Sequence, residues 1–456
     1  MSLKLYDKSK IDFNNLMFSN GDLRKILIPV VVEQLLNSFM GMMDTMMVSN
    51  VGAAAISSVS LVDAINVLVI QVFAALATGG TVICSHYLGR KEVKKCNDAA
   101  QQVTLTVTVI SVLLTVICIG LRVPLLRLIF GSVEQEVMEL SLTYFLITAL
   151  SFPALALFSA GGALFRSCGR TKLPMIIAMI SNGLNIAGNA VLKFVLGMGV
   201  KGAALATLIS RVFGMLMIYA FLRVPKQEIV IRKYFISPDF KVIKRILTIG
   251  IPSGIENGMF QFGKLAIQSS VSTLGTTAIA AQAMAIIMEG FNGIGGVGVG
   301  IGMMTVVGQC MGAGRKEETK YYIVKLTKFA EIVVLVSCVV VYIISRPVAY
   351  LAGMSPESTV IFMDMILFIT ITKPISWTLS FVPSYGFRAA GDVKFSMITS
   401  MCTMWACRVA ISIILIRVCG VGPIAVWIGM ASDWTIRAFI FSGRYMSGRW
   451  LKHRVI

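Results

Sequence analysis

Long apolar runs recur along the whole chain, and short charged segments separate each run from the next. A helix needs about 20 mostly apolar residues to cross the hydrocarbon core of a bilayer. The runs are longer than membrane-spanning strands and lack their strict alternation of apolar and polar residues. The sequence therefore predicts an all-α membrane protein with about twelve transmembrane helices, at residues 25–48, 59–85, 98–120, 138–164, 174–197, 202–222, 246–270, 279–307, 325–345, 360–386, 395–417 and 421–443.

The composition excludes most soluble classes of protein. Hydrophobic residues make up 56% of the chain and charged residues only 14%, whereas about a quarter of a soluble domain is charged. The nine cysteines are scattered singly, without the spacing of a disulfide framework or a zinc site. The sequence has no nucleotide-binding loop and no serine nucleophile elbow. We therefore expect neither an enzyme nor a cofactor.

The basic residues indicate how the chain is oriented in the membrane. The formal net charge is +19, but the basic residues sit between apolar runs rather than along one helix face, which argues against a nucleic-acid partner. About thirty fall on the side that holds both termini, and about five on the other side. Residues 1–23 lack the pattern of a signal peptide. We expect a multi-pass protein of the cell inner membrane with both termini in the cytoplasm.

The two halves of the chain repeat one another. Pro29–Glu33 recurs as Pro252–Glu256 at the start of the second half, and Gly89–Glu92 recurs as Gly314–Glu317. Six predicted spans separate the copies, so both start on the same side of the membrane. This pattern predicts two pseudo-symmetric six-helix bundles, with a solute path between the halves as in transporters built from parallel repeats. The predicted lobes are residues 1–223 and 246–456, joined by a cytoplasmic linker at 224–245.

The glycine run Gly293–Gly302 lies inside the eighth predicted span. Small residues let neighbouring helices approach closely, and they also let a helix bend. The sequence leaves both possibilities open.

Short motifs follow one another in a characteristic order. Each is weak alone, but their order and spacing together are specific. They are Asp44-Thr45, Gly79-Gly80, Gly89–Lys91, Asn185 with Asn189, and Gly199–Ala204 in the first half, and Gln309, Gly312 and Gly314 in the second. In this respect the chain resembles the multidrug and toxic compound extrusion (MATE) family over residues 20–450.

The resemblance implies secondary active efflux of lipophilic, often cationic drugs or toxic compounds by antiport with protons or sodium ions. Its partners would be small-molecule drugs or organic cations and the lipid bilayer, and we expect a monomer. A lipid-linked saccharide flippase, which shares the superfamily fold, is the alternative. Such a flippase is expected to have extra spans and a strongly basic groove, and Lys264 is the residue that keeps this alternative open.

Asp44 is the leading candidate for ion coupling. It is a carboxylate inside the first predicted span, and charges within spans are costly and usually mark transport pathways. A carboxylate in this apolar setting can take up a proton or a sodium ion, and family members carry an ion-coupling aspartate at this place. The alternative is a carboxylate that pairs with a neighbouring helix for packing.

Three further polar residues correspond to a cation site of one family branch. That branch uses an aspartate in span 1, an asparagine and an aspartate in span 5 and a threonine in span 6. The matching residues here are Asp44, Asn185, Asn189 and Thr207, which the resemblance makes a sodium site. Asn189 departs from the pattern, since the branch has an acid there, and this weakens the case for sodium. Hydrogen bonds between helices are the structural alternative for both asparagines.

Other branches carry carboxylates in spans 7 and 10, where this chain has Phe260 and Trp377. The main ion site is therefore not expected in the second half. Glu33 and Glu256 occupy equivalent positions in the two repeats. Glu33 lies on the same helix face as Asp44, where it could relay protons or simply contact water at the inner end. Lys264 is an unusual charge for the middle of span 7, expected to pair with Glu289 or Glu256 or to line the cavity.

Overall fold

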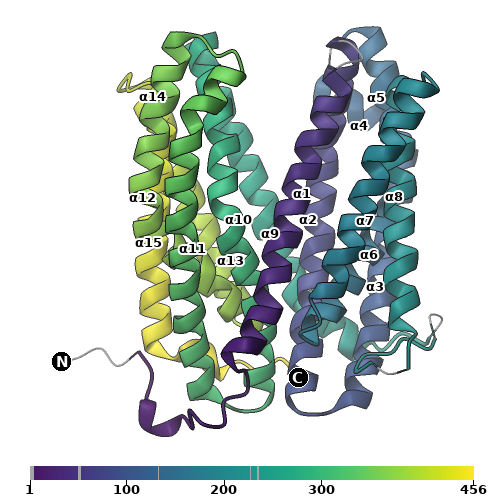
Figure 1. The fold of residues 1–456 in the computed structure, drawn as a ribbon, viewed down its shortest axis with the longest axis vertical. Helices are drawn as coiled ribbons and strands as arrows, with labels where there is room; N and C mark the ends of the chain where they lie inside the picture. The colour runs from purple at the N-terminus through teal and green to yellow at the C-terminus, as the bar shows by residue number, and fades with distance from the viewer. Residues whose placement is uncertain (1–4, 50–52, 132, 226, 234–235) are drawn as a thin grey trace. The chain divides into compact units, whose positions relative to one another are not determined.

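The computed structural model describes residues 5–49, 53–131, 133–225, 227–233 and 236–456; the side chains of residues 40–49, 53, 130 and 194 lie outside this description. Within the described residues the chain is almost entirely helical and contains no strand (Figure 1). The predicted all-α class is confirmed.

The helices of the first half follow the predicted spans within a few residues. They are α1 (Asn20–Ser49), α2 (Ala53–Gly89), α3 (Val93–Gly120), the short α4 (Arg122–Phe130), α5 (Gln135–Leu150), α6 (Phe152–Ser167), α7 (Lys172–Asn189), which continues into the π-helical turn η2 (Ala190–Val195), and α8 (Gly199–Leu222). The fourth predicted span is two helices, because the chain bends by 41° between α5 and α6.

The helices of the second half follow the same order of spans, although one continuous helix replaces the bent pair α5 and α6 and no helix corresponds to α4. They are α9 (Phe240–Val271), α10 (Thr276–Gly312), α11 (Lys316–Leu351), α12 (Pro356–Ala389), α13 (Val393–Thr403), the π-helical turn η4 (Met404–Val409), α14 (Ala410–Arg417) and α15 (Ile424–Ser447). Three short 3₁₀ turns complete the described chain: η1 (Lys8–Lys10), η3 (Ser272–Leu274) and η5 (Arg449–Lys452).

Nine helices among the described residues are long and apolar enough to cross a membrane, and ten spans result when the bent pair α5 and α6 counts as one. The helices α1 and α9, of 30 and 32 residues, are also long enough to span. Both carry a glutamate, Glu33 or Glu256, within the apolar stretch. The predicted count of about twelve transmembrane helices is confirmed.

Contacts divide the chain into two compact units. The N-terminal unit comprises residues 35–254, and the C-terminal unit comprises residues 1–34 and 255–456. The helices α1 and α9 therefore each belong partly to one unit and partly to the other. The lobe limits predicted from the repeat, with a linker at 224–245, stay a prediction.

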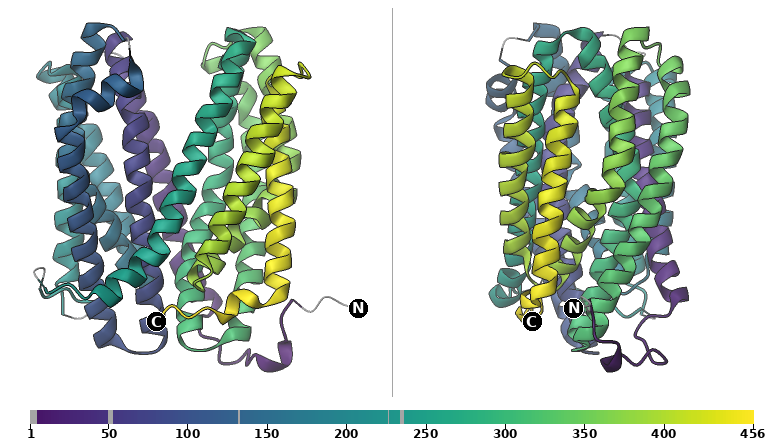
Figure 2. Two further views of the ribbon diagram at one scale, coloured as in Figure 1. Left: turned by 180° about the vertical axis from the view of Figure 1, so that it is seen from behind. Right: turned by 90° about the vertical axis from the view of Figure 1, so that its left-hand side faces the viewer.

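Each unit is a bundle of closely packed helices. In the N-terminal unit α2 packs against α3, α5 and α6, while α8 packs against α5, α6 and α7. In the C-terminal unit α10 packs against α11 and α12, and α15 packs against α12 and α14. Figure 2 shows α15 in yellow running beside α14 in its right-hand view. Buried apolar side chains such as Phe362, Ile369 and Trp427 fill the core of this unit.

The glycine run on α10 serves close helix contact, and α10 continues through it without a break. A methyl group added at Gly296 would lie 2.5 Å from the ring of Trp377 on α12. One added at Gly298 would lie 2.8 Å from the Cα atom of Val31 on α1. Both distances are shorter than a van der Waals contact, so only glycine fits at these positions.

We expect Gly298→Ala to destabilise the protein by about 1–3 kcal/mol, because the new methyl group would push α10 away from the backbone of α1. The measurement is thermal unfolding of the purified protein in detergent. Gly290→Ala on the same helix is the matched control, since nothing lies within 4 Å of its added methyl group. Equal melting temperatures for the two variants would contradict this account of the packing.

Candidate functional site

Three of the residues predicted for the ion site lie together in the N-terminal unit. Asn185 and Asn189 end α7, and both side chains are buried. The Asn189 amide donates a hydrogen bond to the Asn185 carbonyl oxygen at 2.8 Å, and the Asn185 amide donates to the Thr207 hydroxyl on α8 at 3.2 Å. Asp44 falls within α1, but its side chain lies outside the described residues.

The hydrogen-bonded group of Asn185, Asn189 and Thr207 is chemically suited to two roles, binding a cation and holding helices together. Amide and hydroxyl oxygens are ligands that hard cations accept. The same groups also hold α7 against α8, because the Asn185 amide donates to Ser210 as well, at 3.4 Å. The π-helical turn η2 starts directly after Asn189, and such turns are frequent at functional sites. The geometry is therefore compatible with both the ion-site prediction and its structural alternative.

Sequence reasoning missed a second polar group in the N-terminal unit. Asp63 lies within α2, where it accepts a hydrogen bond from Asn66 at 3.1 Å and interacts electrostatically with Arg211 on α8. Arg211 also donates to the Ser151 hydroxyl at 2.7 Å. A lone acid inside an apolar run was the signal that selected Asp44, and the same signal applied to residues 59–85 would have found Asp63.

The C-terminal unit contains a set of charged side chains that we name the cationic cluster. Glu289 on α10 forms an ion pair with Lys373 on α12 at 2.6 Å. Asp433 on α15 contacts two guanidinium groups, Arg437 at 2.6 Å and Arg408 at 2.9 Å. Lys264 on α9 completes the set, because it interacts electrostatically with Glu289 and Arg408. The cluster is Lys264, Glu289, Lys373, Arg408, Asp433 and Arg437.

The expected pairing of Lys264 is therefore only partly seen. Lys264 lies near Glu289, but the ion pair of Glu289 is with Lys373. Glu256 pairs instead with Arg388 at the end of α12, at 2.8 Å. Glu33, its repeat equivalent, is buried. The role of Glu33 as a proton relay stays a prediction.

Aromatic rings surround the cationic cluster. The Arg408 and Arg437 guanidinium groups lie 5.5 and 5.1 Å from the ring centre of Phe260, and the Lys373 ammonium lies 5.0 Å from that of Trp377. Cations at such distances over a ring face are attracted by its quadrupole. The two positions where other family branches have carboxylates therefore hold rings that contact cations.

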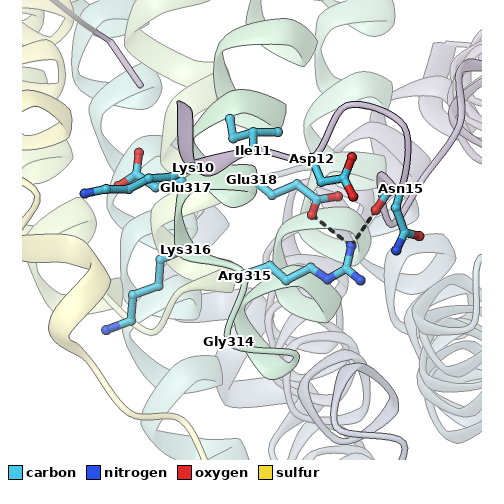
Figure 3. A pocket seen from close by; sticks show the side chains of 9 residues that line it. All are labelled: Lys10, Ile11, Asp12, Asn15, Gly314, Arg315, Lys316, Glu317 and Glu318. Carbon is cyan, nitrogen blue, oxygen red and sulfur yellow. Dashed lines mark hydrogen bonds and ion pairs between the residues drawn. The ribbon is translucent and has the colours of Figure 1, made fainter. Parts of the chain in front are cut away.

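A pocket of 400 Å³ lies elsewhere in the C-terminal unit, between the segment before α1 and the start of α11 (Figure 3). Arg315 donates hydrogen bonds to the Asn15 carbonyl oxygen and to Glu318, both at 3.0 Å. Its lining contains three basic and three acidic side chains, so it carries no net charge to attract an ion. The lining residues are Lys10, Ile11, Asp12, Asn15, Gly314, Arg315, Lys316, Glu317 and Glu318.

Comparison with known proteins adds the family relationships. The sequence model of the family described as MatE matches residues 29–191 and again residues 252–414. The two matches begin at the two copies of the proline–glutamate motif seen in the sequence, which confirms the duplication. Two relatives are the probable multidrug resistance protein NorM of Thermotoga maritima and the uncharacterized transporter YisQ of Bacillus subtilis. Each relative is 25% identical to this chain. The match to NorM covers 95% of this chain and 94% of the relative, and the match to YisQ covers 93% of each.

Solved structures share the fold. A MATE protein in complex with MaL6 matches with a TM-score of 0.88 at 20% identity, over 93% of this chain and 96% of the other. A MOP superfamily transporter from Pyrococcus furiosus, described as having a binding pocket of reverse polarity, matches with a TM-score of 0.88 at 21% identity, over 95% and 96%. At this identity the likeness supports the two-bundle fold alone.

We expect Asp433→Asn to destabilise the protein by about 3–5 kcal/mol, because it leaves the buried Arg408 and Arg437 without their shared carboxylate. The measurement is the melting temperature in detergent. Asp364→Asn, which removes an exposed carboxylate from α12, is the control and should leave stability unchanged. A melting temperature for Asp433→Asn equal to that of the control would show that the ion pairs are dispensable.

Proposed function

Because the chain belongs to the MatE family, we propose that this multi-pass membrane protein exports lipophilic, often cationic drugs or toxic compounds by secondary active transport. A full-length relative that is named a probable multidrug resistance protein supports this class of solute. The observation that carries the proposal is the hydrogen-bonded group of the buried Asn185 and Asn189 with the half-buried Thr207, inside a bundle of membrane-spanning helices. Buried polar side chains within spans are costly, and they commonly mark pathways.

The coupling ion is a proton or a sodium ion that binds at Asp44. The amide and hydroxyl groups of Asn185, Asn189 and Thr207 would complete its surroundings. An ion changes a conformational equilibrium only by binding one state more tightly than the other. Ion binding at Asp44 favours the conformation that releases the solute, which couples outward transport of the solute to inward movement of the ion. With Asn189 in place of an acid, the site has one carboxylate fewer and is less suited to sodium.

The remaining features of the proposal follow from the sequence. The protein lies in the cell inner membrane with both termini in the cytoplasm, because basic residues are concentrated on that side. It works as a monomer, without a cofactor and without enzymatic chemistry. Glu33 and Glu256 lie at equivalent positions along the solute pathway.

A second candidate function is flipping of a lipid-linked saccharide. The cationic cluster favours this alternative, because its four basic side chains suit the phosphate groups of such a lipid. Drug accumulation assays in cells, run beside assays of cell-wall precursor export, separate the two functions.

We expect Asp44→Asn to abolish efflux while the protein stays folded, because an amide cannot take up the coupling proton. Dye efflux from proteoliposomes under an imposed ion gradient measures the effect. Asp98→Asn, which changes an exposed acid on α3, should retain wild-type efflux. Undiminished efflux by Asp44→Asn would refute the proposed coupling.

We expect Asn189→Asp to raise the efflux driven by a sodium gradient relative to the efflux driven by a proton gradient. The added carboxylate supplies the hard, negatively charged ligand that the corresponding site of the related branch contains. The two gradients are imposed separately on matched proteoliposomes. Asn189→Leu is the control, and sodium-driven efflux no higher in the aspartate variant than in the leucine variant would contradict a cation site at this position.

A further inference from the structure

The cationic cluster of the C-terminal unit has more positive than negative charge. Four of its side chains are basic and two are acidic, which leaves a net charge of +2. The six side chains form one connected set within the same unit, through the ion pairs of Glu289 and Asp433 and the electrostatic interactions of Glu289 with Lys264 and Arg408. The excess of positive charge in the cluster therefore comes from residues of the C-terminal unit alone.

The pairing geometry identifies which cations lack compensation. Lys373 uses the carboxylate of Glu289, and Arg437 and Arg408 share that of Asp433. Arg408 is buried, and its Nε atom has no hydrogen-bond acceptor in the part of the chain that the structure describes. Lys264 forms no ion pair with any described residue. Arg408 thus has a buried donor without an acceptor among the described residues, and Lys264 is an exposed lysine without an ion pair there.

Uncompensated charge is costly inside a membrane protein, so its retention calls for a physical reason. An anionic group near Lys264 and Arg408 would neutralise part of the surplus. Charge-assisted hydrogen bonds to a carboxylate or phosphate are also stronger than neutral ones. A cationic group at the same place would be repelled.

The surroundings indicate the rest of the ligand. Lys264 is exposed, whereas Lys373 and Arg408 are buried. The rings of Trp377 and Phe381 stack 5.0 Å apart beside the cluster, and Phe260 lies against both arginines. Apolar ring faces next to exposed positive charge suit an amphiphile with an apolar body and one acidic group.

The internal repeat allows the residues at equivalent positions of the two units to be compared. The family matches begin at positions 29 and 252, and the same shift along the chain takes Asn185 to position 408. Arg408 therefore lies at the repeat position of that neutral amide or beside it. Arg408 is carried by η4, and Asn185 lies shortly before η2, so both lie close to a π-helical turn in the fifth span of their half. The C-terminal unit thus has a positive charge at or next to the position where the N-terminal unit has the neutral Asn185.

We infer that the cationic cluster binds the carboxylate or phosphate group of an amphiphilic solute, with Lys264 as its contact and the buried Arg408 as a further positive charge. This inference rests on the proposed export function and specifies that the solutes include acidic and zwitterionic amphiphiles. Lys264 is the specificity-determining residue, because it is accessible and its charge is unpaired.

Equilibrium binding of two probes with one fluorophore tests the inference. The full chain in nanodiscs of phosphatidylcholine, without any ion gradient, is titrated with dansylglycine, which has a carboxylate, and with dansylamide, which does not. We expect the wild type to bind dansylglycine about tenfold more tightly. In Lys264→Gln the preference should fall to about twofold or less, and Lys264→Arg should restore it.

Lys328→Gln, which removes an exposed charge from α11, controls for the general attraction of anions to a basic protein and should keep the wild-type preference. Equal affinity of the wild type for the two probes would overturn the inference, and this result does not depend on whether any variant folds. An unchanged preference in folded Lys264→Gln would overturn it too. Weaker dansylglycine binding in discs that contain phosphatidylglycerol would identify a lipid headgroup as an anionic occupant of the same site.

The design keeps the inference separate from the proposed function. Because no gradient is imposed, Asp44→Asn should retain the preference for dansylglycine while it loses efflux. A wild-type protein that selects the carboxylate probe but exports no dye under any gradient would contradict the export function and leave the anion site in place.

Discussion

A buried charge in a helix bundle that spans a membrane must find its partner within the protein, because hydrocarbon offers neither water nor counterions. Asp433 illustrates the constraint, since it lies between two guanidinium groups and none of the three side chains is appreciably exposed. The helices that carry these groups, α15 and the η4 turn, are thereby held in a fixed register. The neighbouring aromatic rings add further contacts to the same cations. Much of the interior of the C-terminal unit is organised around this arrangement.

The duplication shows how one fold can serve two kinds of chemistry. The order of the spans repeats in the second half, yet the polar side chains between them differ. The N-terminal unit holds the uncharged Asn185, Asn189 and Thr207, and Asp63 beside Arg211. The C-terminal unit holds a surplus of positive charge. The order of the spans is thus retained across the repeats, while the charged side chains in the two interiors differ.

The sequence predicted the elements well and their pairing less well. Hydropathy located the spans, with helix ends up to nine residues from the predicted limits, since the length of each run is set by the thickness of a bilayer. It could not show the bend between α5 and α6, because both arms are equally apolar. It placed Asn185, Asn189 and Thr207 together through a motif, but it left Lys264 with two possible partners. The ion pairs Glu289–Lys373 and Glu256–Arg388 join residues 84 and 132 positions apart, and such pairings depend on packing that no local pattern contains. Asp44, the residue on which the coupling proposal rests, has a side chain outside the described residues.

The division of α1 and α9 between the two units has a consequence for how the protein is made. Residues 1–34 pack with the C-terminal unit, where Val31 and Leu27 lie against the glycines of α10 that tolerate no side chain. That surface of α10 therefore stays uncovered until residues 1–34, which are synthesised much earlier, pack against it. If the polypeptide were cut at its midpoint, each fragment would lack a helical segment that packs in its own unit. The two halves therefore depend on one another during biogenesis, although each contains a copy of the repeat.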